Sequence, residues 1–316
     1  MRIDFEATGA TLSPDQLEQL SRIIYLIEDG WHSWAGPDPE HESLEPYYSS
    51  HERHRELLSK SYTQSLAYPQ STHQSIVITN ADVDEGAAYS FERAYTFLNQ
   101  CLDILVENQR NDGRFFEHVL GPIDPELVSL FHTQRPPLRW QHGGGKDEIF
   151  KLLEDRIKDF TDRSVRPRLL VIVDSDSRWP GHVAAGNERL SRLCSDASIE
   201  LWILHKRSIE NYVPDRAIRQ YADDESELRA RAEAILRLTP TQRDHFPVKS
   251  GLAADLHADE KVLYADIVGS PAAKAALPNV VAYFIRHFAA CSTEDLHKRG
   301  CLSEFVTLVE LIRGEL

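Results

Sequence analysis

A run of five apolar residues, "LLVIV" at 169–173, ends directly before two aspartates, Asp174 and Asp176. A short run without polar alternation is typical of a strand buried on both faces of a parallel sheet. Parallel strands need long crossover connections, usually helices, so this run predicts alternating strands and helices around it. It also places two carboxylates just beyond the end of a buried strand, where ligands bind in open α/β sheets.

The alternation that this run requires extends from about residue 102 to 212. Strands are expected in "LDILVEN", which ends at Glu107, in "LRWQHGGGK", in "RLLVIVDSD" and in "IELWIL". Between them, helical spacing of apolar residues predicts a short helix after 110, an amphipathic helix at 146–160 and a helix at 182–196. The order strand-helix-strand-helix predicts a parallel sheet with helices on its faces.

The flanking segments are expected to be mainly helical. Residues 1–100 contain a helix start at Ser13-Pro14-Asp15-Gln16, a short strand candidate at 75–79 and a turn at 82–85. Helices are expected again at 222–237, 279–290 and 302–313. The predicted fold is therefore α/β, with a parallel-sheet core at 101–215 between mainly helical segments at 1–100 and 216–316.

Composition places this chain of 316 residues among ordinary globular proteins, with 41% apolar and 27% charged residues. No stretch of about 18 apolar residues is present, so no membrane-spanning helix is expected. The first ten residues lack the apolar region of a secretory signal. The four cysteines are scattered and form no Cys-x-x-Cys pair, which favours reduced thiols in a cytoplasmic protein.

The net charge of −15 argues against non-specific binding of nucleic acid by the whole surface. The charge is uneven, however, because residues 135–219 carry 16 Lys and Arg against 13 Asp and Glu. This locally basic segment is compatible with a groove that binds phosphates, and equally with chance.

Acidic residues follow three of the expected strands. Glu107 closes the first, Asp174 and Asp176 close the third, and Glu210 lies just beyond the fourth. Because the carboxyl ends of parallel strands share one edge, these four side chains are expected to converge there. Converging carboxylates repel one another unless a cation lies between them, and oxygen ligands favour Mg²⁺ or Mn²⁺. The alternative for any single acid is a solvated loop residue or a helix cap.

The glycine-rich stretch "HGGGK" at 142–146 does not match a P-loop. A P-loop needs Gly-x-x-x-x-Gly-Lys-Ser/Thr, whereas Trp140 stands five residues before Gly145 and Asp147 follows Lys146. The stretch is interpreted as a strand-to-helix turn near the acidic edge.

The order of these motifs resembles the TOPRIM domain of topoisomerases, primases and OLD (overcoming lysogenization defect) nucleases. An apolar strand ends in Val-Glu at 106–107, and a later one ends in Asp-x-Asp at 174–176. The stretch "LHKRSIENYV" at 204–213 is similar to the R-x-I-E-N-Y segment of OLD-like nucleases, and "HFPVKSGLAADL" from His245 resembles a later segment of that group. The resemblance covers about residues 102–255.

This resemblance implies a Mg²⁺-dependent (or Mn²⁺-dependent) nuclease, similar to stand-alone OLD-like effectors of anti-phage systems. It implies metal binding by Glu107, Asp174, Asp176 and Glu210, and charge neutralisation at the scissile phosphate by Lys249. The chain departs from the family at two points. Asn108 replaces the usual glycine after the glutamate, and the acid expected four residues after Glu107 is Asn111, with Asp112 next to it.

The expected partners are a nucleic-acid substrate and a separate regulatory protein such as an ATPase, and a homodimer is compatible with the sequence. Phosphate contacts are expected from Arg135, Arg139, Lys206 and Arg207, although Arg207 and Glu210 could instead pair with each other. Two other functions remain open, a non-catalytic subunit with a TOPRIM fold and an Asp-x-Asp nucleotide-sugar glycosyltransferase. DNA, RNA and tRNA all remain open as substrates.

Overall fold

The computed structural model of the chain describes residues 1–6, 12–67, 75–79, 88–162, 165–288 and 291–316. The described residues form two four-stranded sheets with the strand orders β2-β1-β3-β4 and β6-β5-β7-β8. All neighbouring strands run parallel, so the α/β class expected from the sequence is confirmed. The turn expected at 82–85 lies outside the described residues.

The second sheet is the core expected at 101–215. Its strands are β5 (Leu102–Val106), β6 (Leu138–His142), β7 (Leu169–Val173) and β8 (Glu200–Ile203). Every residue of β5 and β7 is buried, because these two central strands are covered on both faces. Their side chains alternate between two hydrophobic clusters, with Ile104 and Ile172 in one and Leu105 and Val171 in the other.

Helices cover the two faces of this sheet. On one side lie α7 (Lys146–Asp162) and α8 (Ala185–Asp196), whose apolar residues Ile149, Leu153 and Leu190 join Leu105 and Val171. On the other side lie α5 (Arg114–Leu120), α6 (Pro125–Leu130), α13 (Val280–His287) and α15 (Leu302–Glu315). This is the layered arrangement that buries an apolar parallel sheet.

The N-terminal region contains the first sheet, which the sequence analysis did not predict in full. Its strands are β1 (Arg2–Glu6), β2 (Ser33–Gly36), β3 (Ser75–Thr79) and β4 (Ala88–Tyr89), of which only β3 was expected. The short β1 and β2 carry polar residues, so no apolar run marks them. Their helices are α1 (Pro14–Glu28), α2 (Glu45–Tyr48), α3 (Arg53–Ala67) and α4 (Phe91–Leu98).

The C-terminal region is helical, as expected. Beyond α13 and α15 it contains α9 (Asp215–Asp224), α10 (Arg229–Leu236), α11 (Pro240–His245), α12 (Ala258–Leu263) and α14 (Thr293–Lys298). The helix expected at 222–237 is wrong as a single element. Glu225 leaves the helical conformation, and a 3₁₀ turn at Ser226–Leu228 separates α9 from α10.

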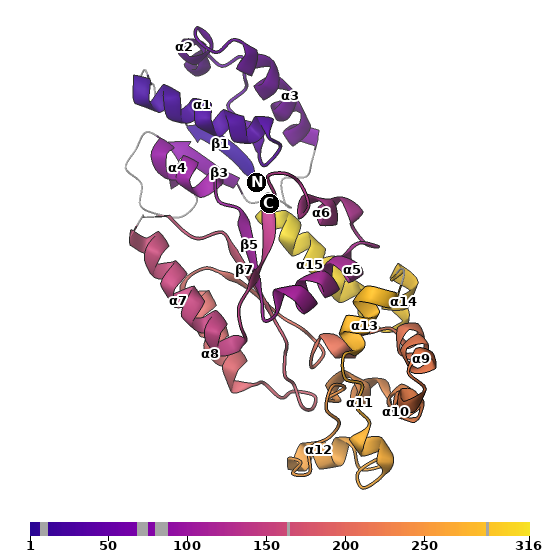
Figure 1. Ribbon diagram of the computed structural model, residues 1–316. Coiled ribbons are helices and arrows are strands. Elements are labelled where there is room, and N and C mark those ends of the chain that lie inside the picture. The colour runs from indigo at the N-terminus through magenta and orange to yellow at the C-terminus, as the bar shows by residue number, and fades with distance from the viewer. Residues whose placement is uncertain (7–11, 68–74, 80–87, 163–164, 289–290) are drawn as a thin grey trace.

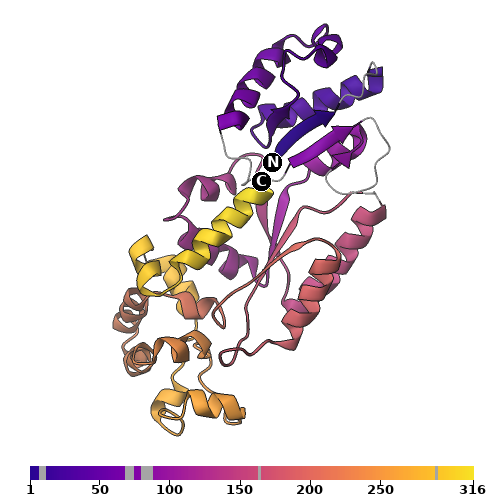
Figure 2. The same cartoon turned by 180° about the vertical axis from the view of Figure 1, so that it is seen from behind.

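Figures 1 and 2 show an elongated molecule in which the N-terminal sheet and the C-terminal helices lie at opposite ends of the second sheet. Helix α15 runs back along this sheet toward the N-terminal region. Asp29 beside α1 and Arg135 before β6 form an ion pair of 2.9 Å between the two regions. Among the described residues, no helix has the length and apolar character that crossing a membrane requires.

Candidate functional site

The structure brings Glu107, Asp174 and Glu210 to one edge of the second sheet. Glu107 follows β5 and Asp174 follows β7, and these two strands are hydrogen-bonded neighbours. Glu210 belongs to a 3₁₀ turn, η3 (Ile209–Tyr212), after β8. The backbone N–H of Ile209 donates to Oδ1 of Asp174 at 3.2 Å, which fixes this turn beside the end of β7.

Asp112 joins this group through an unusual turn. The chain after Glu107 forms a π-helical turn, η2 (Gln109–Gly113), before α5 begins. A π-helical turn contains about one more residue than an α-helical turn. The side chain that faces back toward the preceding strand is therefore one position later in the sequence than it would be in an α-helix. Asp112, five residues after Glu107, accepts a hydrogen bond from the Asn108 N–H at 2.7 Å. The turn therefore brings Asp112 near Glu107, whose charge is one of the causes that raise the pKa of Asp112.

The carboxyl groups at this edge perturb one another. Burial raises the pKa of Asp174 well above its usual value, and the nearby charges of Glu107, Glu210, Asp112 and Asp176 raise it further. Burial also raises the pKa of Glu107, against the opposing charge of Lys146. For Asp112, burial raises the pKa to about 7, although the hydrogen bond from Asn108 acts in the opposite direction. These carboxylates thus share a desolvated, mutually repulsive environment.

Lys249 lies at the same edge, beside Glu210. Its Nζ is 3.0 Å from Glu210 Oε1, and the lysine side chain is 73% exposed while that of Glu210 is only 9% exposed. The charge of Glu210 is the main cause that raises the pKa of Lys249. Glu210 is therefore not paired with Arg207 on the surface, which was the alternative for this glutamate.

Asp176 points to a different cation, Lys146. The backbone of Asp176 has a φ of +50°, a left-handed conformation that is uncommon outside glycine and is found at functional sites. The Lys146 ammonium donates to Asp176 Oδ2 and, at 2.7 Å, to the carbonyl oxygen of Asp174. The sequence analysis missed Lys146. Its signal was the place of "HGGGK" after a strand of the same sheet, which brings the lysine to the same edge.

The glycine turn that presents Lys146 needs at least one of its glycines. Gly143 donates its N–H to the carbonyl oxygen of Val106 at 2.8 Å. A Cβ atom at Gly143 would collide with the side chain of Ile149 and would lie 3.0 Å from that same carbonyl oxygen. A side chain here would push β6 and α7 apart.

The "SIENY" stretch is a structural frame around Glu210. Asn211 is fully buried, and its side-chain Nδ2 donates to the carbonyl oxygens of Arg243 at 2.6 Å and Phe246 at 2.8 Å. The Tyr212 hydroxyl donates to Glu304 at 2.7 Å and accepts from the Lys206 N–H at 2.9 Å. These bonds join η3 to the segment that leads to Lys249 and to α15.

A second asparagine, Asn187 of α8, holds the Asp-x-Asp loop. It is buried, and its Nδ2 donates to the carbonyl oxygens of Asp174 at 3.1 Å and Ser175 at 2.9 Å. The sequence analysis did not single out Asn187, because a lone asparagine in a helix gives no signal of its own.

Two of the four expected phosphate-binding residues lie away from this edge. Arg139 belongs to the start of β6, and its Nε is 2.5 Å from Oδ1 of the buried Asp103, at the opposite end of the sheet from Glu107. Arg135 precedes the same strand and pairs with Asp29. The sequence could not reveal that these two arginines lie away from the carboxylate edge, because both are basic and both lie close to a core strand in the sequence.

The other two lie close to the edge but differ in environment. Lys206 is buried, and its Nζ is 2.8 Å from Asp244 Oδ1, which also accepts from Arg299. Arg207 is half-buried and donates to the carbonyl oxygen of His245 at 3.2 Å. Burial lowers the pKa of Arg207, and no carboxylate of the described residues lies within 4 Å of it. Arg207 is thus the cation of this set that is free to meet an anion.

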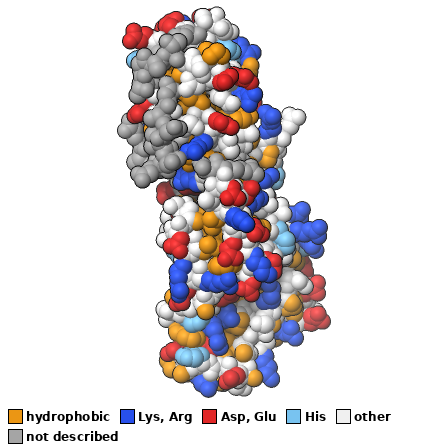
Figure 3. Space-filling view, turned by 90° about the vertical axis from the view of Figure 1, so that its left-hand side faces the viewer, with side chains coloured by type: hydrophobic (Ala, Val, Ile, Leu, Met, Phe, Trp, Pro, Cys, Tyr) orange, Lys and Arg blue, Asp and Glu red, His pale blue; other side chains and the backbone are white. Residues whose placement is uncertain are grey.

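The surface charge is mixed rather than uniformly basic. In Figure 3, which shows the face with the left-hand side of Figure 1 toward the viewer, acidic and basic side chains are interspersed below the grey N-terminal segments. Among the described residues of that face, neither sign of charge gathers into one broad patch.

The residues at this edge fit a hard divalent cation in their chemistry. All candidate ligands are carboxylate oxygens, the kind that Mg²⁺ and Mn²⁺ prefer. Glu107 Oε1 is buried and has no hydrogen-bond partner in the described part of the chain. No three Asp, Glu, His or Cys side chains among the described residues are already arranged to hold an ion together. Binding an ion would therefore require side chains such as Asp176 to turn inward.

Comparison with known proteins adds no relative. No family model, no curated protein and no solved structure matches the chain.

Proposed function

We propose that the chain is a nuclease that hydrolyses phosphodiester bonds at this carboxylate edge with the help of Mg²⁺ or Mn²⁺. The observation that supports it most is the convergence of four carboxyl groups, those of Glu107, Asp112, Asp174 and Glu210. The pKa values of Asp112 and Asp174 are raised, and the charges of Glu107 and Glu210 contribute to both shifts. Such a cluster is costly in a protein without a cation, and perturbed carboxyl groups gather at functional sites.

The proposed roles follow from the placement of each residue. Glu107, Asp174 and Glu210 would hold the metal ion, with Asp112 and Asp176 as further ligands. When bound, the ion supplies polarisation of the phosphate and a lower pKa of an attacking water. Lys249 is exposed above Glu210 and can contact a substrate phosphate. Arg207, beside the Asp-x-Asp loop, can position a neighbouring phosphate.

The cellular setting is a further part of the proposal and rests on the resemblance to OLD-like TOPRIM nucleases. We propose a cytoplasmic effector of an anti-phage system whose access to nucleic acid depends on a partner such as a separate ATPase. The four cysteines, all free thiols, and the net charge of −15 are consistent with this setting.

A second candidate function, a non-catalytic subunit with the same fold, is favoured by one observation. Lys146 and Lys249 already contact Asp176 and Glu210, so two of the carboxylates have cations without a metal ion. In that case the lysines would replace the ion and the edge would have only a structural role.

A plasmid-nicking and RNA-cleavage assay separates the two candidates. The wild type is expected to cleave with Mg²⁺ or Mn²⁺, and not in EDTA. Glu210→Gln keeps the shape and removes the charge, so it should reduce turnover at least about 100-fold, as expected when a group needed for the metal site is lost. The matched control is Glu188→Gln, an exposed glutamate on α8.

Wild-type turnover by the Glu210→Gln variant would contradict the proposal. Absence of cleavage by every preparation, together with absence of metal binding, would favour the non-catalytic subunit. A parallel assay of nucleotide-sugar binding tests the glycosyltransferase alternative.

A further inference from the structure

Lys146 bridges the two aspartates of the Asp-x-Asp loop. Its Nζ donates to the carbonyl oxygen of Asp174 at 2.7 Å and to the carboxylate of Asp176. Only 14% of the lysine side chain is exposed, whereas the side chain of Asp176 is 53% exposed. A largely buried ammonium group thus holds a carboxylate that solvent still reaches.

The position of Lys146 is not one that its helix favours. Lys146 is the first residue of α7, where the partial positive charge of the helix N-terminus disfavours a cation. The next two residues, Asp147 and Glu148, are the acids that suit such a position. The lysine is therefore placed here against the preference of the helix, which indicates that the carboxylate edge is what it serves.

Helix α8 fixes the rest of the lysine side chain. A Cβ atom at Gly186 would lie 3.6 Å from Lys146 Cδ, so the aliphatic part of the lysine passes close to this helix. The next residue of α8, Asn187, donates to the same carbonyl oxygen of Asp174 at 3.1 Å. The contacts with α8 and with the Asp174 carbonyl oxygen keep Lys146 in place even when the Asp176 side chain moves.

The backbone of Asp176 is fixed, while its carboxylate is exposed. The Asp176 N–H donates to the carbonyl oxygen of Arg207 at 2.9 Å. Both neighbours in the chain, Ser175 and Ser177, are buried, and the Ser175 hydroxyl donates to the carbonyl oxygen of Lys206 at 2.8 Å. A rotation of the Asp176 side chain about χ1 is therefore enough to move its carboxylate.

The Asp176 carboxylate is close enough to the other acids to join them. Its charge contributes to the raised pKa values of both Glu107 and Asp174. The charge of Lys146 acts on Glu107 in the opposite direction, so lysine and aspartate both face this group of acids.

We propose that Lys146 is a positioning residue of the metal site, which holds Asp176 outward in the metal-free protein and releases it when Asp176 becomes a ligand beside Glu107 and Asp174. This inference rests on the proposed metal-dependent function. It follows that Lys146 stabilises the metal-free protein but weakens metal binding, because its bond to Asp176 has to break first. A lysine with only a structural role would support both.

Calorimetric titration with Mn²⁺ and thermal melting in EDTA, both on the full chain, test this pair of opposite effects. Lys146→Met should lower the melting temperature of the metal-free protein, because the acids of the edge lose a cation. The same variant should bind Mn²⁺ about tenfold more tightly, as expected when a charged hydrogen bond no longer has to break.

A double-mutant cycle shows whether the effect passes through Asp176. In the Asp176→Asn background, Lys146→Met should tighten Mn²⁺ binding by about twofold or less, the range within which independent changes add. An equal gain in both backgrounds would mean that Lys146 acts only through its charge, and would overturn the proposal.

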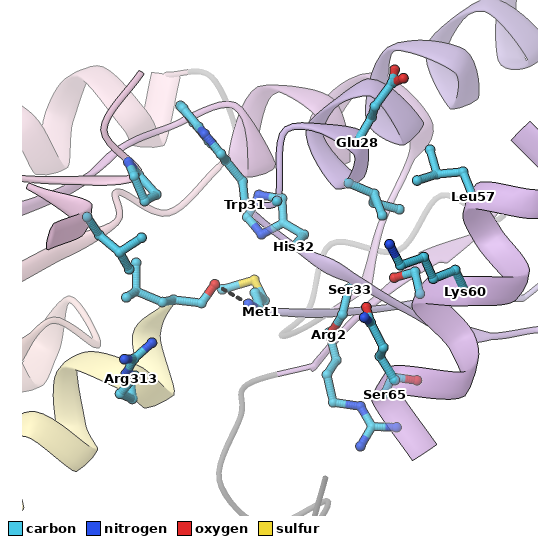
Figure 4. Close-up of a pocket in the computed structure, with 17 residues that line it drawn as sticks. Met1, Arg2, Glu28, Trp31, His32, Ser33, Leu57, Lys60, Ser65 and Arg313 are labelled. Carbon is cyan, nitrogen blue, oxygen red and sulfur yellow. Dashed lines mark hydrogen bonds between the residues drawn. The ribbon is translucent and has the colours of Figure 1, made fainter. Parts of the chain in front are cut away.

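Two other lysines provide controls. Lys151 is an exposed residue of α7, and Lys60 lines a cavity of about 530 Å³ beside the N-terminal region (Figure 4). Lys151→Met and Lys60→Met each remove one positive charge and should bind Mn²⁺ like the wild type. Lys146→Gln keeps a donor for the Asp174 carbonyl oxygen, so it should fold even if Lys146→Met does not, and should show the same two effects.

The possible failures are distinguishable. Unchanged or weaker Mn²⁺ binding by both Lys146 variants, with a wild type that binds the ion, would overturn this inference and leave the metal site standing. Absence of binding by the wild type and by both variants would contradict the metal site itself, and this inference with it.

Discussion

Asp174 is the residue on which the carboxylate edge depends most. It lies between Glu107 and Glu210, accepts a hydrogen bond from the Ile209 N–H, and has its pKa raised by burial and by four neighbouring acids. A carboxyl group whose pKa is raised in the folded state lowers stability as the pH rises above the pKa of the unfolded chain. At neutral pH, Asp174 therefore destabilises the metal-free protein.

The first prediction concerns Asp174→Asn. The amide keeps an acceptor for Ile209 and removes the charge, so the metal-free variant should melt above the wild type, by about 2–4 °C for each kcal/mol gained. Mn²⁺ should raise the melting temperature of the wild type and leave that of the variant nearly unchanged. Asp155→Asn, at an exposed position of α7, should behave as the wild type. A lower melting temperature of the metal-free Asp174→Asn variant would argue against repulsion at this edge.

The second prediction concerns pH. The pKa of Asp112 is raised to about 7 and that of Asp174 is also raised, so protons compete with a metal ion in the neutral range. From about pH 8 to pH 6 the metal-free fold should gain stability from these groups, because they take up protons in the folded state before the unfolded state does. The rise in melting temperature caused by Mn²⁺ should accordingly shrink. An equal rise at both pH values would contradict the assignment.

At the scale of single residues, the sequence predicted the placement of the acidic side chains better than that of the basic ones. Glu107, Asp174 and Glu210 follow apolar strands, and strand ends of a parallel sheet meet at one edge whatever the details of the loops. Lys146 and Arg207 depend on where two loops place their side chains, and a buried lysine such as Lys206 looks the same in sequence as an exposed one. The backbone strain at Asp176 likewise has no sequence signal.

Two short turns decide the geometry of the edge at the scale of elements. The π-helical turn Gln109–Gly113 brings Asp112 back to the strand, and the 3₁₀ turn Ile209–Tyr212 presents Glu210 while Asn211 and Tyr212 point into the interior. The sequence predicted a helix after 110 but not its first turn, because the extra residue changes the hydrogen-bond pattern rather than the hydrophobic pattern.

The third prediction tests the structural part of the "SIENY" stretch. Asn211→Ala leaves the buried carbonyl oxygens of Arg243 and Phe246 without their donor, so the free energy of unfolding should fall by about 2–5 kcal/mol. Denaturant unfolding measures this difference. The exposed Asn111→Ala is the control and should change stability by less than about 0.5 kcal/mol. A small effect of Asn211→Ala would mean that the turn is held by other contacts.

Two sheets define the molecule as a whole, and the regions around them are joined by polar contacts such as Arg135–Asp29 and by apolar packing of Phe160 and Val165 in the N-terminal hydrophobic cluster. The core sheet could be predicted from its apolar strands. β1 and β2 of the N-terminal sheet are short and contain polar residues, and they are strands through their pairing, β1 with β3 and β2 with β1. The charges between the two regions are also a property of the assembled molecule. Arg135 meets Asp29 there, although nothing near Arg135 in the sequence indicates such a partner.

The fourth prediction compares two arginines that looked alike in the sequence. Arg135→Ala should leave nucleic-acid binding unchanged and alter stability by at most about 1 kcal/mol, because its ion pair is exposed. Arg207→Ala should weaken binding about tenfold, because this cation has no carboxylate partner among the described residues. Fluorescence anisotropy with a labelled oligonucleotide, with Mn²⁺ replaced by Ca²⁺ to slow cleavage, measures both. Equal losses would mean that the basic residues act only through net charge.

Calorimetric titration of metal-free protein with Mn²⁺ tests the central claim, a divalent metal site at the carboxylate edge, most directly. The account predicts saturable binding by the wild type and by Asp155→Asn, and a loss of about tenfold or more in affinity for both Asp174→Asn and Glu210→Gln. Absence of binding by the wild type at millimolar Mn²⁺, or unchanged affinity in both edge variants, would contradict it.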